Sequence, residues 1–266
     1  MRPLLISALL LAVAVPASAQ LAPHNAAGVT YGHVHLSVSD IELHKKLWVE
    51  HFGGVVVQKG TLTVVKLPNM LIAFRPTPAT GGSRGTVMDH FGFKVQNLAE
   101  VLKKWRAAGY EVTREFIGSE GFPNAYLSGP DNIYVELQED KALPVKASGY
   151  HIHFLHADYA KLRDWYVDLF SLTPRARGKI PTTADAPGMN LSFATSETPT
   201  VGTRGRAIDH IGFEIRDLEA FCKKLEARGI KFDVPFREVP AIGLKIAYIT
   251  DPNGVYIELT EGYDKY

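Results

Sequence analysis

Cysteine is nearly absent from this sequence of 266 residues, which contains only Cys222. A single thiol excludes an intramolecular disulfide, and a chain of this length does not need one to fold. Cys222 lies at helical spacing among Leu218, Phe221 and Leu225. The spacing predicts a small residue of the core and not a nucleophile.

The sequence also lacks an excess of charge of either sign. Its 29 Lys and Arg residues nearly balance 28 Asp and Glu residues, for a net charge of +1. That balance gives no reason to expect nucleic acid or an anionic membrane as a partner. Low-complexity tracts are absent, and the composition (46% hydrophobic, 21% charged) is that of a globular chain with one large or two small domains.

Long apolar runs are absent after the first twenty residues. The run from Leu4 to Val15 follows a short basic start and precedes Pro16-Ala17-Ser18-Ala19, an Ala-x-Ala cleavage pattern. Since this run is short for a membrane span, we interpret residues 1–19 as a signal peptide cleaved after Ala19. The mature chain is then expected to be periplasmic or secreted, with no membrane association after cleavage.

What the sequence does contain is an internal duplication. The alternating stretch His151-Ile152-His153-Phe154 repeats His33-Val34-His35-Leu36, and Asp209-His210-Ile211-Gly212-Phe213 repeats Asp89-His90-Phe91-Gly92-Phe93. Each stretch predicts a strand, and each is followed by a helix with an Asp or Asn cap: Asp40, Asn97, Asp158 and Asp217. An internal repeat of this kind is a strong architectural signal.

The repeats divide the chain into four βαβββ units. We expect a first domain at 29–140, a linker at 141–148 and a second domain at 149–266. The polar stretch 175–187 has no clear period, and we interpret it as a candidate lid. The predicted fold is α+β, with two tandem domains of paired βαβββ units, each a mixed, curved sheet with helices outside.

Two histidines and one glutamate recur on the polar face of the predicted strands in each half. His33, His90 and Glu136 carry this pattern in the first half, because alternate residues point to opposite faces of a strand. A carboxylate within an apolar strand is costly unless it is solvated, paired or bound to a cation. Two imidazoles and one carboxylate favour Fe(II), and also suit Mn, Zn or Ni. The alternative is that these faces simply meet solvent.

The order of units, with His on the first strand of each unit and Glu on the last strand of every second unit, resembles the vicinal oxygen chelate superfamily. That group includes glyoxalase I, type I extradiol dioxygenases, fosfomycin-resistance enzymes and bleomycin-binding proteins. The resemblance implies an incomplete eight-stranded barrel around a metal in each domain. The ligands that it implies are His33, His90 and Glu136 in one domain, and His151, His210 and Glu258 in the other.

The same resemblance suggests four catalytic candidates. His35 and His153 lie two residues beyond a ligand, so they share its face of the strand and could be fallback ligands or acid/base groups. Tyr126 and Tyr248 could hydrogen-bond a bound oxygen, or could simply be packing residues. Arg84 and Arg204, in repeated glycine-rich loops, could hold an anionic substrate or could be solvated.

The sequence departs from individual members of the superfamily. Glyoxalase I commonly has a further carboxylate ligand, but the corresponding stretches 71–74 and 190–193 contain no acid. Extradiol dioxygenases are closer, although the acid/base histidine that they usually carry before the tyrosine is missing here. The sequence therefore predicts a metal-dependent enzyme, dioxygenase-like or lyase/isomerase-like, acting on a small oxygenated substrate. The alternative is a non-catalytic binding protein, and the chain could be a monomer or a homodimer.

Overall fold

The structure, a computed structural model, describes residues 21–265. The predicted signal peptide, residues 1–19, lies outside the described residues. Within residues 21–265, no helix is long and apolar enough to span a membrane.

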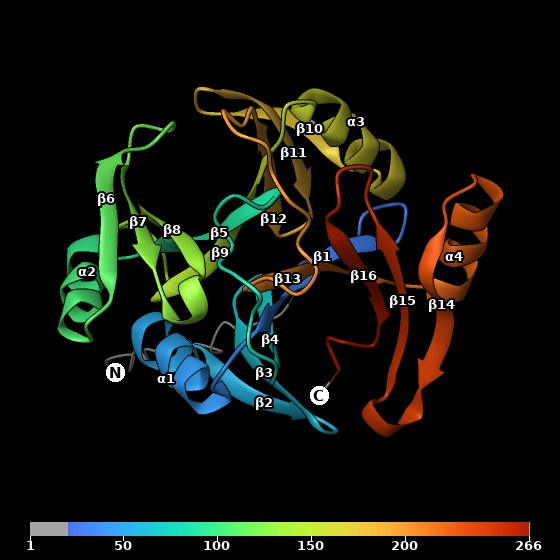
Figure 1. The fold of residues 1–266 in the computed structure, drawn as a ribbon, viewed down its shortest axis with the longest axis horizontal. Helices are drawn as coiled ribbons and strands as arrows, with labels where there is room; N and C mark the ends of the chain where they lie inside the picture. The colour runs from blue at the N-terminus through green and yellow to red at the C-terminus, as the bar shows by residue number, and fades with distance from the viewer. Residues whose placement is uncertain (1–20, 266) are drawn as a thin grey trace, which may run out of the picture.

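The four predicted βαβββ units are present (Figure 1). Unit 1 contains β1 (Val29–Ser37), α1 (Ile41–Phe52), β2 (Val55–Lys59), β3 (Leu62–Leu67) and β4 (Met70–Arg75). Unit 2 contains β5 (Met88–Val95), α2 (Leu98–Ala107), β6 (Glu111–Ile117), β7 (Pro123–Ser128), the short 3₁₀ helix η1 (Pro130–Asn132) and β8 (Tyr134–Glu139).

The second half repeats this order. Unit 3 contains β9 (Ala147–Leu155), α3 (Tyr159–Phe170), β10 (Thr173–Arg177), β11 (Ile180–Ala186) and β12 (Met189–Ala194). Unit 4 contains β13 (Ile208–Ile215), α4 (Leu218–Ala227), β14 (Phe232–Val239), η2 (Pro240–Ile242), β15 (Leu244–Thr250) and β16 (Tyr256–Glu261).

The prediction of a lid at 175–187 is wrong, because these residues form most of the β10–β11 hairpin. The two strands pair antiparallel, from Thr173 opposite Asp185 to Arg177 opposite Ile180. The turn between them uses Gly178 at φ +57, a left-handed conformation that glycine adopts without strain. Buried polar residues on the hairpin, including Thr183, hid the alternating apolar pattern that predicts a strand.

The four units form two eight-stranded mixed sheets with the helices outside, as predicted. The units do not pair in chain order, however. The sheet β14-β15-β16-β13-β1-β4-β3-β2 joins units 1 and 4, and we call it the terminal sheet. The sheet β10-β11-β12-β9-β5-β8-β7-β6 joins units 2 and 3, and we call it the central sheet. The predicted ranges 29–140 and 149–266 thus follow the duplication, whereas each sheet takes one unit from each range.

Two antiparallel strand pairs hold the sheets together at their middle. In the terminal sheet β1 pairs with β13, and His35 lies opposite His210. In the central sheet β5 pairs with β9, and His90 lies opposite His153. The concave side of each sheet, which carries these histidines, is referred to below as its cup.

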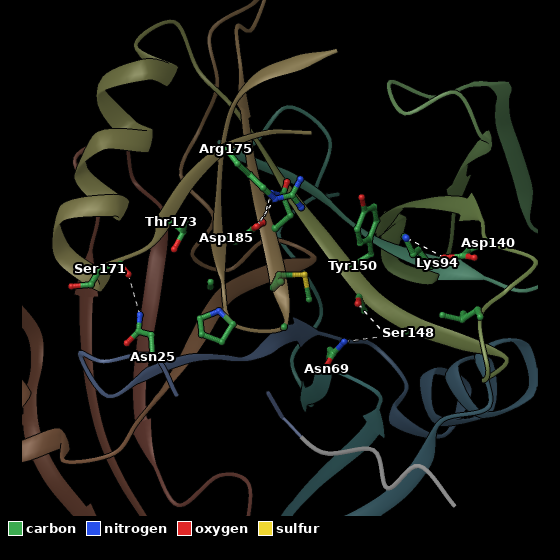
Figure 2. A pocket seen from close by; sticks show the side chains of 17 residues that line it. Asn25, Asn69, Lys94, Asp140, Ser148, Tyr150, Ser171, Thr173, Arg175 and Asp185 are labelled. Atoms are coloured by element: carbon green, nitrogen blue, oxygen red, sulfur yellow. Dashed lines mark hydrogen bonds and ion pairs between the residues drawn. The ribbon is translucent and has the colours of Figure 1, made fainter. Parts of the chain in front are cut away.

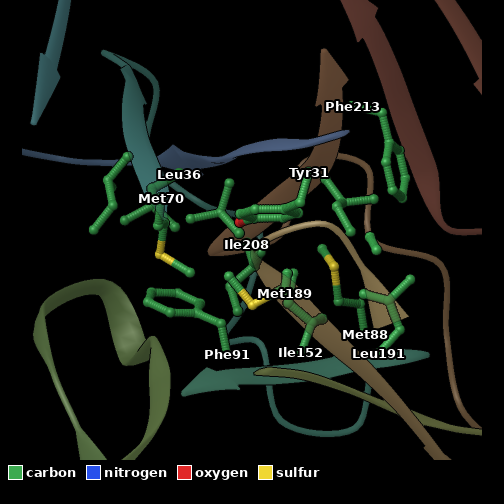
Figure 3. Packing of buried hydrophobic residues seen from close by; sticks show 14 of the residues in the cluster. Tyr31, Leu36, Met70, Met88, Phe91, Ile152, Met189, Leu191, Ile208 and Phe213 are labelled. Atoms are coloured by element: carbon green, nitrogen blue, oxygen red, sulfur yellow. The ribbon is translucent and has the colours of Figure 1, made fainter. Parts of the chain in front are cut away.

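The opposite faces of the same strands build the hydrophobic core. Leu36 and Ile208 of the terminal sheet pack in one cluster with Phe91, Ile152 and other residues of the central sheet (Figure 3). The helices add their apolar faces to the same cluster. Cys222 on α4 is part of it and is 2% exposed, which confirms the interpretation as a core residue.

Three of the four predicted helix caps form. The side chains of Asp40, Asn97 and Asp217 each accept a hydrogen bond from a backbone N–H three residues on. Asp158 occupies the cap position of α3, but its side chain makes no such bond. Its φ of −92° and ψ of 33° depart from the extended backbone that caps usually adopt.

This difference gives a stability prediction. Asp40→Ala should lower the free energy of unfolding by about 1 kcal/mol, because the backbone N–H of Leu43 loses its acceptor. Asp158→Ala is the matched control and should change it much less. Urea denaturation followed by circular dichroism measures both, and equal losses for the two variants would contradict the assignment of the caps.

Candidate metal centres

The cup of the terminal sheet holds a cluster built around one carboxylate oxygen. Glu258 Oε2 lies 2.9 Å from His33 Nε2 and 3.1 Å from His210 Nε2. His35 joins them, and the ligand atoms of all four residues lie within 4.8 Å of one another. The residues come from β1, β13 and β16, which are adjacent strands of the sheet.

The cup of the central sheet repeats this arrangement. Glu136 Oε2 lies 3.0 Å from His151 Nε2 and 3.1 Å from His90 Nε2. The ligand atoms of His90, Glu136 and His153 lie within 4.8 Å of one another, in a group that does not include His151. Both ring nitrogens of His153 are buried without a hydrogen-bond partner.

The structure corrects the expected grouping of the ligands. His33 meets His210 and Glu258, whereas His151 meets His90 and Glu136. The first strand of each half has exchanged partners, because β1 pairs with β13 and β9 pairs with β5. The residue types were identified from the sequence, but both halves carry the same pattern, and nothing in it specifies which units pair.

A glycine on the neighbouring strand makes room for each exchanged histidine. A Cβ atom at Gly212 would lie 2.0 Å from the ring of His33, and one at Gly92 would lie 2.2 Å from the ring of His151. Any larger residue would displace the imidazole. The glycine of the repeated His-x-Gly-Phe stretch is therefore required by the close approach of the partner strand.

The spacing of the donor atoms fits a bound metal ion. With metal–ligand bonds of about 2.1 Å, two ligands at right angles lie about 3 Å apart. The four distances between histidine nitrogen and glutamate oxygen, 2.9 to 3.1 Å, match this value. The unpartnered ring nitrogens of His153 add a further donor. Each cluster can thus hold a divalent cation with two or more imidazoles and one carboxylate.

An aspartate orients one ligand in each cup, a role that the sequence analysis did not predict. Asp89 Oδ1 lies 2.8 Å from His90 Nδ1, and Asp209 Oδ1 lies 2.6 Å from His210 Nδ1. The other oxygen of each aspartate accepts a backbone N–H, from Gly85 or Gly205. A carboxylate behind a ligating imidazole fixes its tautomer and raises its basicity. The repeated Asp-His pair was the sequence signal for this role.

The charges in the clusters follow from these contacts. Burial disfavours the carboxylate of Glu136, but His151 and His90 outweigh it and hold its pKa well below the usual value. Burial likewise disfavours the charged form of His90, yet Asp89 and Glu136 raise its pKa to about 9. Burial and the nearby Arg177 lower the pKa of His151 to about 4. Neutral His151 keeps a lone pair for a cation.

The two cups differ at equivalent positions of the strand register. In the central cup these positions carry the buried polar residues Asn124, Thr183, Asn190 and Ser192. In the terminal cup they carry Ile246, Val64, Leu71 and Ala73, in the same order. Asn124 donates to the second oxygen of Glu136 at 2.5 Å, a bond that an isoleucine cannot make. The clusters are alike, but their surroundings are polar in one cup and apolar in the other.

The end of the chain fills the terminal cup. The ring of Tyr263 stacks on His33 with centroids 4.5 Å apart, and Tyr263 is 1% exposed. The buried carboxyl group of Glu214 holds this segment by accepting the backbone N–H groups of Gly262 and Tyr263. Tyr263 also packs with the apolar residues of the cup, such as Leu244.

The central cup instead opens to a cavity of about 510 Å³. His90, His153 and Tyr126 line it, so it gives access to the cluster. A larger cavity of about 620 Å³ lies beside β9 to β12 and is lined by polar side chains such as Tyr150 and Arg175, but by none of the cluster residues (Figure 2). The larger size of this cavity is therefore no evidence that it is the active site.

The two candidate tyrosines lie against the clusters. The ring of Tyr126 meets His90 edge-on at 5.2 Å, and that of Tyr248 meets His210 edge-on at 5.5 Å. Burial and the nearby glutamate raise the pKa of both phenols, so each keeps its proton and can donate a hydrogen bond. Tyr126 lines the open cavity, whereas Tyr248 packs against the apolar residues of the filled cup.

Comparisons with known proteins agree with this architecture. Residues 150–259 match the family model of the Glyoxalase/Bleomycin resistance protein/Dioxygenase superfamily. Glyoxalase I from Zea mays is similar with a TM-score of 0.65 and 17% identity, over 89% of this chain and 93% of that chain. A variant of the same enzyme gives 0.66 and 16%, over 89% and 95%.

A Bacillus subtilis protein assigned by its name to the dioxygenases is also similar. Its TM-score is 0.68 at 14% identity, over 87% of this chain and 85% of that chain. A search among curated protein sequences found no match. The glyoxalase-like paired-domain fold and the resemblance to the vicinal oxygen chelate superfamily are thus confirmed.

The crossed grouping of ligands predicts which substitutions remove the same metal ion. His33→Ala and Glu258→Ala should each remove one equivalent, and the double variant should remove no more, because both residues belong to one cluster. Combining His33→Ala with Glu136→Ala should remove two equivalents. Elemental analysis of each purified variant measures this. A combined loss of only one equivalent would instead support ligand sets in chain order.

Glu214 predicts a dependence of stability on pH. Burial raises its pKa from 4.5 to about 7 in the folded chain, so the folded state binds the proton more tightly than the unfolded state. The protonated carboxyl group of Glu214 therefore stabilises the folded chain. This stabilisation is fully present below about pH 4.5 and is lost as the pH rises to about 7.

The variant Glu214→Gln, which stays neutral, should remove this loss. The free energy of unfolding, measured with urea at about pH 5 and about pH 8, should fall less in the variant than in the wild type. The same fall in both proteins would exclude Glu214 as its source.

Proposed function

We propose that this chain is a divalent-metal-dependent enzyme of the vicinal oxygen chelate type and that the central cup is its active site. The observation that carries the proposal is the cavity of about 510 Å³ that opens onto His90 and His153 beside Glu136. A buried ligand cluster, convergent polar groups and an open chamber are the combination that defines a small-molecule site. The substrate is a small oxygenated compound.

The residues His90, Glu136 and His151 would hold the metal, with His153 as a further donor. Two imidazoles and one carboxylate favour Fe(II), with Mn, Zn or Ni as alternatives. A bound ion would supply Lewis-acid chemistry, which stabilises negative charge on adjacent oxygens of a substrate. The reaction is then dioxygenase-like or lyase/isomerase-like.

Side chains of the protein orient the metal ligands and provide the groups that can hydrogen-bond a substrate. Asp89 and Asn124 fix His90 and Glu136 through the hydrogen bonds described above, which limits the motion of both ligands. The phenol of Tyr126 faces the cavity with its proton retained and can donate a hydrogen bond to a substrate oxygen. Burial lowers the pKa of His153 well below its usual value, so this unpartnered imidazole stays neutral. It can accept a hydrogen bond from a bound substrate if it is not a ligand.

The absence of a further carboxylate argues against a reaction like that of glyoxalase I. In the register of the sheets, Asn190 lies beside His151 and Leu71 lies beside His33. Neither residue can supply the additional negative ligand. We therefore favour the dioxygenase-like alternative for the central cup.

We also propose that the mature chain is exported, because the N-terminal sequence has the pattern of a signal peptide.

A non-catalytic binding protein is the second candidate. It draws support from the terminal cup, where His33, His210 and Glu258 are kept although Tyr263 fills the space beside them. A cluster of that kind suits a structural metal ion more than a reaction, because the buried ring of Tyr263 stacks on His33 and takes up room beside the cluster. His35 and Tyr248 would then be packing or ligand residues and not catalytic residues.

Metal content and turnover separate the two candidates. In anaerobically purified protein, Glu136→Ala should lose one metal equivalent and all activity, because it removes the shared ligand of the central cup. Glu258→Ala, the matched control, should lose one equivalent and keep most of its activity. Oxygen uptake and product analysis with catechols and α-keto compounds provide the readout. Metal binding without turnover on any of them would favour the binding protein.

A further inference from the structure

Two arginines lie at the mouth of the central cup. Arg84, between β4 and β5, and Arg114, on β6, line the same cavity as His90 and His153. The guanidinium of Arg84 lies 4.7 Å from the ring centre of Tyr134, and that of Arg114 lies 5.0 Å from the ring centre of Phe116. These contacts position both cations, because the face of an aromatic ring attracts them.

Neither arginine is neutralised by an acidic partner. Among residues 21–265, no carboxylate oxygen lies within 4.0 Å of the guanidinium nitrogens of Arg84 or Arg114. Two acidic residues line the same cavity. Asp89 is bound to His90 and to the backbone of Gly85, and within residues 21–265 the carboxylate of Glu111 lies more than 4.0 Å from either guanidinium. The mouth therefore offers two guanidinium groups with free donors.

The equivalent mouth of the terminal cup lacks this feature. Arg204 corresponds to Arg84 and contacts the ring of Tyr256 in the same way, at 4.4 Å. It also lies 3.9 Å from Asp233, which occupies the register position of Thr113. Val234 occupies the position of Arg114. In the terminal cup Arg75 also has an acidic partner, Asp209 at 3.8 Å. Among residues 21–265, the pair of arginines without an acidic partner is thus found at the cup that opens to the cavity.

We infer that the substrate of the central cup carries a carboxylate in addition to its vicinal oxygens, and that Arg84 and Arg114 bind it. The planar fork of a guanidinium matches the two oxygens of a carboxylate. The cavity of about 510 Å³ has room for a single-ring acid with its oxygens at the cluster and its carboxylate at the mouth. This inference rests on the proposed function for the position of the cluster.

A pair of probes that differ only in the carboxylate tests this substrate class. Binding of 3,4-dihydroxybenzoate and of catechol is measured anaerobically by calorimetry on the metal-loaded chain. The wild type should bind 3,4-dihydroxybenzoate at least about tenfold more tightly, as expected for charge-assisted hydrogen bonds. The variant Arg84→Gln/Arg114→Gln should lose this preference and bind catechol as before.

Arg204→Gln is the matched control, since it removes the equivalent arginine of the terminal cup, and it should leave both affinities unchanged. Equal affinity of the wild type for the two probes would overturn the inference. So would an undiminished preference in Arg84→Gln/Arg114→Gln, or the absence of binding of either probe.

Metal content, measured on the same samples, separates this inference from the proposed function. If metal binds through Glu136 but the preference is absent, the carboxylate site fails and the metal centre stands. If the preference is present in a chain that binds no metal, the proposed function fails and the carboxylate site stands.

Discussion

The structure depends on one shared contact, in which a single carboxylate oxygen meets imidazole nitrogens from two other strands. Glu258 makes this contact in the terminal sheet and Glu136 makes it in the central sheet. The contact requires three strands to lie in one register, and it places a charge where burial would otherwise be costly. Glycines at 92 and 212 are needed for the same contact, because the histidine rings occupy the space of a side chain.

Much of this arrangement could be predicted from the sequence, because it follows from local patterns repeated twice. Alternation assigned His33 and Glu136 to the polar face of their strands, and the duplication distinguished them from ordinary solvent-exposed residues. The pairing of units could not be predicted. Units 1 and 3 carry the same strand pattern, so the choice between partners depends on long-range packing of the core, which no local pattern records.

The prediction of a lid at 175–187, where the structure has the β10–β11 hairpin, failed for a related reason. The inward residues of this hairpin, such as Thr183, are polar because they belong to a polar cup, and polarity removes the alternation by which a strand is recognised. In unit 1 the equivalent position carries the apolar residue Val64. The feature that distinguishes the central cup chemically is thus the one that concealed its strands.

The crossed pairing of units also fixes an order of assembly. The ligands Glu136 and His151 are 15 residues apart, whereas His33 and Glu258 are 225 residues apart. During synthesis the central sheet has all its strands once Ala194 has emerged, but β1 then still lacks its neighbour β13. Unit 1 must remain unpaired at that edge until the last unit is made, and closing so long a loop slows folding. The terminal sheet is therefore the part of the molecule that is exposed longest to misfolding and to pairing with a second copy of the chain.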